Sequence, residues 1–128
     1  TRRTCASTTK VRIRNTLKQV YGNPATITDE LVEIIYDPAC DRKAQKVFAS
    51  ILSAPPGPRL GELLSHIHQP LLVLWGEADP WTPIQGALAF KELENAKVIP
   101  IAGAGHCPHD ERPDLVNPLM IDWLNHLL

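Results

Sequence analysis

Two titratable residues, Asp79 and His106, are spaced so that a carboxylate and an imidazole could act together. Each follows a short apolar run, residues 71–75 for the aspartate and residues 98–99 for the histidine. If both runs are parallel strands, their carboxyl ends lie at one edge of the sheet, where α/β proteins place their chemistry. In such a pair the carboxylate fixes the imidazole tautomer and stabilises its protonated form, so the two residues could be the acid and base of a catalytic triad.

The segment between the two apolar runs has the pattern of a helix over about residues 83–93. Thr82 is its expected N-cap and Pro83 its first helical residue, because both types are favoured at those positions. Strand, helix and strand at this spacing predict one βαβ unit with parallel strands. The first run is apolar at every position, which is typical of a parallel strand covered on both faces.

Four helices are expected before the first strand, over about residues 11–21, 29–37, 41–52 and 60–67. Thr28 is the expected N-cap of the second helix. A terminal helix is indicated by apolar residues at helical spacing from Leu115 onward. We expect Asn117 to cap it with Pro118 at the first helical position, because proline disrupts a helix interior. Asp110 and Glu111 are also expected to cap this helix.

Length and composition restrict the class of protein. The 128 residues suffice for one domain. The net charge of −1 predicts no strong attraction to nucleic acid, and no apolar run reaches the ~20 residues of a membrane span. The three cysteines cannot all pair with one another in disulfide bonds, which favours a reducing intracellular compartment such as cytoplasm or plastid. The acid-free, basic first 28 residues are read as an exposed helix face in preference to a transit-peptide remnant.

The residues around the candidate pair resemble those of the α/β-hydrolases. Residues 70–83, Pro-Leu-Leu-Val-Leu-Trp-Gly-Glu-Ala-Asp-Pro-Trp-Thr-Pro, resemble the family's acid-bearing strand and turn. Residues 101–111, Ile-Ala-Gly-Ala-Gly-His-Cys-Pro-His-Asp-Glu, resemble its histidine loop. Within the family, Asp-Pro-Trp and Gly-His-Cys-Pro-His-Asp-Glu are similar to plant and cyanobacterial hydrolases of the pheophytinase and chlorophyll dephytylase group, which cleave phytyl esters of chlorophyll pigments.

The resemblance implies an α/β fold, namely the C-terminal part of an α/β-hydrolase with parallel strands. Residues 11–58 resemble the family's helical cap, and residues 59–128 resemble a core segment with a βαβ unit, whose terminal helix over residues 113–128 matches the family's last helix. Residues 1–10 are expected to be a disordered arm, because the start of the chain shows no periodicity. Asp79 would be the triad acid and His106 the triad base. Trp81, which could line a substrate pocket or only pack against its neighbours, and Cys107, a small wall residue, are the expected substrate-contacting residues. No cofactor is expected.

The sequence departs from the family at the nucleophile. That residue sits on a Gly-x-Ser-x-Gly turn upstream of the cap, and none of the serines at positions 7, 50, 53 and 65 has these neighbours. An acid–base pair without a nucleophile can orient a proton acceptor and do little more. We therefore expect a truncated or split serine-type ester hydrolase that is inactive alone. It would need a complementary N-terminal half or self-association, and a small lipophilic ester would be its substrate once complemented.

Three alternatives remain open at this point. Haloalkane dehalogenases and epoxide hydrolases share the Asp/His layout but use an aspartate nucleophile. A non-catalytic interaction module derived from a hydrolase would bind a partner through its cap or an exposed strand edge. A metal site could be formed by His106, Cys107 and His109, with His66 and His68, but these residues lack the spacing of a zinc site, so we expect no metal.

Overall fold

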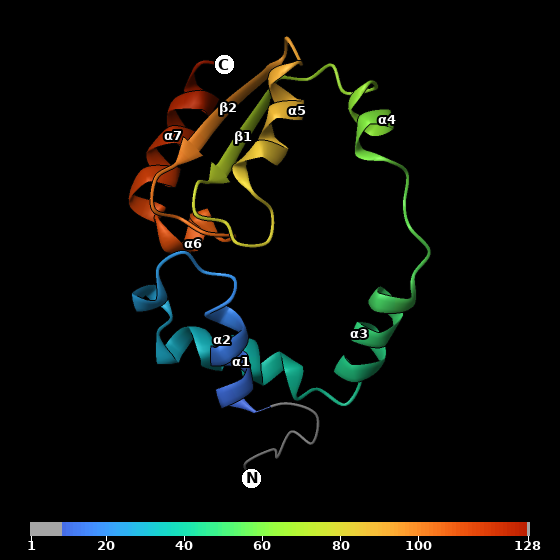
Figure 1. Cartoon of the computed structure of the whole chain (residues 1–128), viewed down its shortest axis with the longest axis vertical. Helices are drawn as coiled ribbons and strands as arrows, with labels where there is room; N and C mark the ends of the chain where they lie inside the picture. The colour runs from blue at the N-terminus through green and yellow to red at the C-terminus, as the bar shows by residue number, and fades with distance from the viewer. Residues whose placement is uncertain (1–8, 128) are drawn as a thin grey trace. The chain divides into compact units, whose positions relative to one another are not determined.

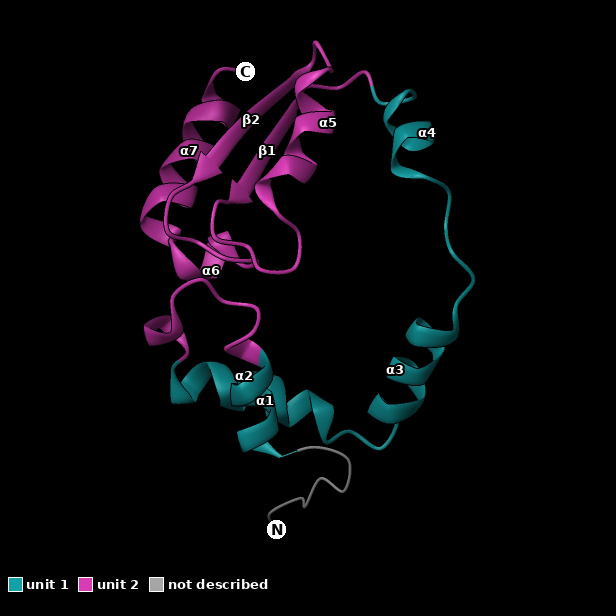
Figure 2. Ribbon diagram, viewed as in Figure 1, with its two compact units in different colours: residues 1–16, 28–67 teal, residues 17–27, 68–128 magenta. Residues whose placement is uncertain are grey.

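The computed structural model describes residues 9–127, which form two compact units (Figure 2). Residues 9–16 and 28–67 make up the first unit, and residues 17–27 and 68–127 make up the second. The disordered arm predicted for residues 1–10 lies outside the described residues up to residue 8, and Lys10 already begins a helix. Residues 17–27 group with the sheet, although they precede most of the helical unit in the chain.

The first unit is helical (Figure 1). Its helices are α1 (Lys10–Leu17), which ends at the boundary of the unit, α2 (Asp29–Ala39), α3 (Ala44–Ser53) and α4 (Leu60–Leu64). The predicted cap of α2 is confirmed, because the Thr28 hydroxyl accepts a hydrogen bond from the Leu31 amide at 3.1 Å. Ion pairs from Lys10 to Glu33 and from Arg14 to Asp29 join α1 to α2. None of the helices among residues 9–127 combines the length and apolar character needed to cross a bilayer.

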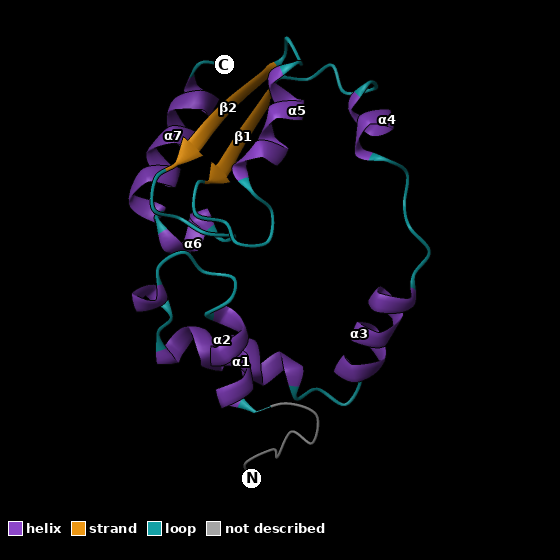
Figure 3. Cartoon of the chain, viewed as in Figure 1, coloured by secondary structure: helices purple, strands orange, loops and turns teal. Residues whose placement is uncertain are grey.

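The second unit is built on the predicted parallel strands, β1 (Leu71–Gly76) and β2 (Ala96–Ile101) (Figure 3). Leu71 pairs with Ala96 and Gly76 with Ile101, so the strands end side by side. The connection contains a 3₁₀ turn, η2 (Ile84–Ala87), and a short helix, α5 (Leu88–Lys91), where the sequence predicts one helix. The remaining elements of this unit are η1 (Pro24–Thr26), α6 (Pro108–Glu111) and α7 (Pro113–Asn125).

Helical residues pack on both faces of β1, although its apolar residues 71–75 are half-buried and not fully covered as the sequence predicts. On one face, the core contains Ile101, Ala104 and Val116 of α7, with Leu74 packed against them. On the other face, the Trp75 ring lies 6.2 Å from the ring of Phe90 in α5. Because neighbouring strand residues point to opposite faces, Leu74 and Trp75 anchor β1 between helices on both sides. This packing fixes the end of β1, from which the next loop starts.

Four residues predicted to cap helices do not cap them, namely Thr82, Asn117, Asp110 and Glu111. The Thr82 hydroxyl donates to Asp79 and is not a cap; Pro83 stands at the position before η2. Asn117 is not a cap either, because α7 begins four residues earlier. Glu111 is 4% exposed and accepts hydrogen bonds from backbone amides of two loops, so it does not cap α7. In each case a tertiary contact or an alternative helix start replaces the local pattern.

Pro118 lies inside α7 and generates a testable prediction. Its ring nitrogen cannot donate to the carbonyl four residues earlier, and an interior proline costs a helix roughly 3 kcal/mol. We expect Pro118→Ala to raise the free energy of unfolding by about 1–2 kcal/mol, after allowance for the greater entropy of the unfolded alanine chain. Thermal melting measures the change, with Asn117→Ala, an exposed neighbour in the same helix, as the control. A lower melting temperature for Pro118→Ala than for the parent chain would contradict the prediction.

Candidate active site

The two loops that follow β1 and β2 meet at the end of the sheet. Asp79 lies in the turn after β1, and His106 lies in the segment of residues 102–107, here called the histidine loop. The Ala78 amide donates to the Ala104 carbonyl at 2.9 Å, which joins the loops. A Cβ atom on Gly76 would lie 1.9 Å from the Gly105 carbonyl oxygen, so only glycine allows the backbones to approach this closely.

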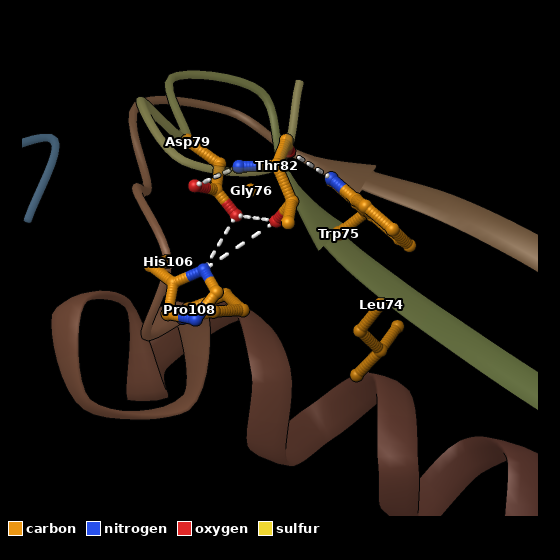
Figure 4. Close-up of a pocket in the computed structure, with 7 residues that line it drawn as sticks. All are labelled: Leu74, Trp75, Gly76, Asp79, Thr82, His106 and Pro108. Atoms are coloured by element: carbon orange, nitrogen blue, oxygen red, sulfur yellow. Dashed lines mark hydrogen bonds and ion pairs between the residues drawn. The ribbon is translucent and has the colours of Figure 1, made fainter. Parts of the chain in front are cut away.

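Asp79 and His106 form a hydrogen-bonded pair (Figure 4). The distance from His106 Nδ1 to Asp79 Oδ2 is 2.8 Å, and Oδ2 also accepts a hydrogen bond from the Thr82 hydroxyl. The other oxygen, Oδ1, accepts from the Trp81 amide at 2.8 Å and from the Thr82 amide at 3.0 Å. Both oxygens of the carboxylate are therefore satisfied by directed donors.

These donors decide the charge of Asp79. Its side chain is 5% exposed, and burial alone would raise the pKa of the carboxyl group. The hydrogen bonds from Thr82, His106 and Trp81 outweigh burial and lower the pKa of Asp79 to about 2. The group is consequently an anion at neutral pH and can only accept hydrogen bonds from its neighbours.

The ionised carboxylate fixes the tautomer of His106. Because Asp79 only accepts, the hydrogen bond between them requires a proton on Nδ1, and the lone pair of the neutral ring then lies on Nε2. Among residues 9–127, Nε2 has no hydrogen-bond partner, and the His106 side chain is 38% exposed. The imidazole is thus oriented as a general base whose acceptor atom is accessible.

A pocket of about 240 Å³ lies beside the pair. Its lining includes the polar groups of Asp79, Thr82 and His106, and Leu74 and Trp75 lie across from the Asp79–His106 pair (Figure 4). The apolar part of the lining consists of Leu74, Trp75, Gly76 and Pro108. The described residues that line this pocket include no lysine or arginine.

Of the two predicted substrate-contacting residues, Trp81 contacts the His106 ring and Cys107 follows His106 in the chain. The Trp81 ring is tilted by 52° to the His106 ring, with 5.5 Å between ring centroids, and Trp81 is 56% exposed. Cys107 is half-buried. Burial raises the pKa of the Cys107 thiol, and nearby carboxylates raise it further, so the sulfur is not a thiolate nucleophile. Substrate contact by either residue stays a prediction.

Sequence reasoning missed two polar side chains at the site. The Thr82 hydroxyl donates a hydrogen bond to the Asp79 carboxylate, and its oxygen lies 3.4 Å from the Nδ1 atom of His106. Its position three residues after an aspartate in a proline-containing turn is typical of local side-chain hydrogen bonding, and that signal could have identified it. Glu111 accepts amides from residues 22 and 23, which are almost 90 positions away, and no local pattern indicates such a contact.

The metal alternative has no structural support within the described part of the chain. Over residues 9–127, no group of three or more His, Cys, Asp or Glu side chains is arranged to hold a metal ion. The nitrogen of His106 that faces Asp79 is engaged in the 2.8 Å hydrogen bond. The arrangement of the pair is that of an acid–base couple.

Comparison with known proteins finds similar sequences among the hydrolases. A sequence model of the alpha/beta hydrolase family matches residues 8–119. The chloroplastic pheophytinase of Arabidopsis thaliana is 38% identical over 120 residues, which are 90% of this chain and 25% of that protein. A 2-hydroxy-6-oxononadienedioate/2-hydroxy-6-oxononatrienedioate hydrolase of Paraburkholderia xenovorans (strain LB400) is 29% identical over 110 residues, 80% of this chain and 37% of that protein.

The fold is shared with solved hydrolases. The structure of a meta-cleavage product hydrolase from Pseudomonas fluorescens IP01 superimposes with a TM-score of 0.79 at 22% sequence identity. The match covers 95% of this chain and 47% of the solved chain. The present chain therefore spans between a quarter and a half of the length of these related proteins.

The low pKa of Asp79 predicts how stability depends on pH. The pKa is lower in the folded state than the ordinary value near 3.9, so the stabilisation is complete above about pH 5 and is lost as the pH falls toward 2. The contribution is about 2 kcal/mol. We expect Asp79→Asn to flatten the acid dependence of denaturant unfolding over this range, and Asp122→Asn, at an exposed carboxylate, to leave it unchanged. Equal acid dependence in Asp79→Asn and the parent chain would contradict this assignment.

Proposed function

This chain belongs to the alpha/beta hydrolase family, and from that membership we propose that it supplies the acid and base of a carboxylic ester hydrolase. The observation that carries the proposal is the 2.8 Å hydrogen bond between His106 Nδ1 and a carboxylate fixed by four donors. The nucleophile of the reaction, a serine, would come from residues outside these 128. As part of the same proposal, residues 11–58 form the cap and residues 59–128 the core segment.

The chemistry follows from the orientation of the ring. The serine oxygen would attack the ester carbonyl carbon while Nε2 of His106 accepts the hydroxyl proton. His106 would then donate this proton to the leaving alcohol, and water would hydrolyse the acyl-enzyme by the same route. Asp79 stabilises the imidazolium formed in each step by its fixed negative charge. Without the serine and its oxyanion-binding amides, the chain alone would not turn over esters.

The substrate that we propose is an ester of a lipophilic alcohol, such as a phytyl ester. Two observations support this class over a dicarboxylate. The lining of the pocket beside His106 includes apolar residues, and the described residues that line it include no cation to bind a carboxylate. Identity is also higher to pheophytinase, at 38%, than to the hydrolase of a dioate, at 29%.

The partner of the chain would bind at the outer edge of β1. Over residues 9–127 the sheet has two strands, and a sheet of this size rarely persists without further cover. A groove of about 480 Å³ lies between β1 and α7. Its lining is apolar and consists of Pro70, Leu71, Leu72, Leu74, Met120, Trp123 and Leu124. A complementary hydrolase segment would satisfy the strand edge, and a second copy of the chain would do so less completely.

A grafted hydrolase tests the proposed function. The 120 residues of Arabidopsis thaliana pheophytinase that align with this chain are replaced by those of this chain. We expect turnover of p-nitrophenyl esters and of a phytyl carboxylate ester by the grafted hydrolase, and none by the 128-residue chain alone. Because His106 is the only proposed base, His106→Ala should reduce kcat by about 10³-fold or more.

The matched control is His109→Ala, which removes an exposed histidine three residues away and should leave kcat unchanged. Circular dichroism shows whether each variant is folded. Ester turnover by the chain alone that disappears in His106→Ala would refute its predicted inactivity. A folded grafted hydrolase that keeps its activity after His106→Ala would refute the assignment of the base.

A further inference from the structure

Glu111 is a buried carboxylate that the proposed reaction does not use. It stands at the end of α6 and is 4% exposed, and a charge so deeply buried is costly unless donors surround it. Glu111 accepts four backbone amides. Oε1 accepts from Gly105 at 2.9 Å and Cys107 at 3.3 Å; Oε2 accepts from Gly22 at 2.8 Å and Asn23 at 3.1 Å. One side chain thus joins the histidine loop to residues 20–23, here called the buttress segment.

The contacts of Glu111 lie on both sides of His106 in the chain. Gly105 and Cys107 donate to its carboxylate, and the His106 amide between them donates to the Val20 carbonyl of the buttress segment at 3.0 Å. Three successive amides of the histidine loop are therefore held in place. These hydrogen bonds restrict the backbone at the residue whose side chain has to be oriented.

The buttress segment also limits where the histidine loop can move. A Cβ atom on Gly105 would lie 2.2 Å from the Gly22 nitrogen, so the two backbones are in direct contact. On the opposite side, the Gly105 carbonyl lies against Gly76 at the end of β1. A second link runs from the Tyr21 hydroxyl to Asp110 at 2.8 Å. The histidine loop is consequently enclosed between the strand end and the buttress segment.

We propose that Glu111 is a positioning residue for His106, whose carboxylate locks the histidine loop onto the buttress segment and so maintains the Asp79–His106 hydrogen bond. The proposal rests on the proposed function in one respect: it takes His106 to be the base. It assigns residues 20–23, which precede the cap helix α2, to the support of the active site. Glu111 itself contacts neither the pocket nor Asp79 in the described structure.

Glu111→Gln tests this role with almost no change in shape. The amide group of glutamine would turn a donor toward two of the four backbone N–H groups, so one of the two loops loses its acceptor. Glu94→Gln makes the same chemical change at an exposed glutamate and is the matched control. Both variants are made in the 128-residue chain and in the grafted hydrolase.

The first readout is spectroscopic and needs no activity. In the chain, the low-field proton resonance of His106 Nδ1 reports the bond to Asp79, and hydrogen exchange reports the amides of residues 22, 23, 105 and 107. We expect Glu111→Gln to abolish the resonance and to accelerate exchange by about tenfold or more in at least one of the two loops. An unchanged Nδ1 resonance in a variant whose amides exchange faster would overturn the positioning role, because Glu111 would then be structural only.

The second readout is kinetic. In the grafted hydrolase we expect Glu111→Gln to lower kcat about 100-fold with KM within twofold, because displacement of the base affects the transition state and not substrate binding. A rise in KM at constant kcat would overturn the proposal. If the grafted hydrolase with wild-type residues is inactive, the proposed function fails, and the Nδ1 resonance in the chain alone decides the role of Glu111.

A third measurement covers the case in which Glu111→Gln does not fold. In the wild-type chain at increasing denaturant, the proposal requires the amides at residues 22, 23, 105 and 107 to open with one common free energy. The Nδ1 resonance of His106 must disappear in the same opening. The proposal would be overturned if the amides of the buttress segment opened at lower denaturant than those of the histidine loop while the His106 Nδ1 resonance remained.

Discussion

The parallel register of β1 and β2 is the constraint on which the site depends. Gly76 pairs with Ile101, so the two strands end together and their loops start from the same edge. Asp79 lies three residues after the end of β1, and His106 lies five residues after the end of β2. At these positions their side chains are within hydrogen-bond distance. A shift of the register by a single residue would move one loop by about 3.3 Å, which exceeds the tolerance of a hydrogen bond. The all-apolar β1, held between helices on both faces, maintains this register.

Two carboxylates, those of Asp79 and Glu111, orient His106 in different ways. Asp79 is held by Thr82 and Trp81 and sets the charge and tautomer of the imidazole. Glu111 is held by backbone amides and sets the path of the loop that carries the imidazole. Both avoid the cost of a buried charge because every contact comes from a directed donor. The fold thus orients His106 from its ring and from its backbone, although the nucleophile that we propose for it lies outside the chain.

The sequence was sufficient for the strands, the parallel pairing and the Asp79–His106 pair, because an unbroken apolar run and a titratable residue after it are local signals. The local pattern was insufficient for the start of α7, which the resemblance places at Pro113 as observed; the helix continues through Pro118 because the packing of residues such as Val116 on the sheet outweighs the proline. Glu111 looked like a helix cap because its true partners at residues 22 and 23 adjoin it only after folding. The family resemblance identified the fold, and the contacts around the histidine loop could come only from the structure.

The ring protonation of His106 tests the central claim most directly, because a base of this kind must present a bare Nε2 atom. Long-range proton–nitrogen NMR spectra of the histidine rings distinguish the two tautomers of a neutral imidazole. At a pH where the ring is neutral, we predict that His106 carries its proton on Nδ1 and that Asp79→Asn disturbs this preference. A His106 ring protonated on Nε2 in the wild-type chain would contradict the account, since the atom assigned to accept the nucleophile's proton would already hold one.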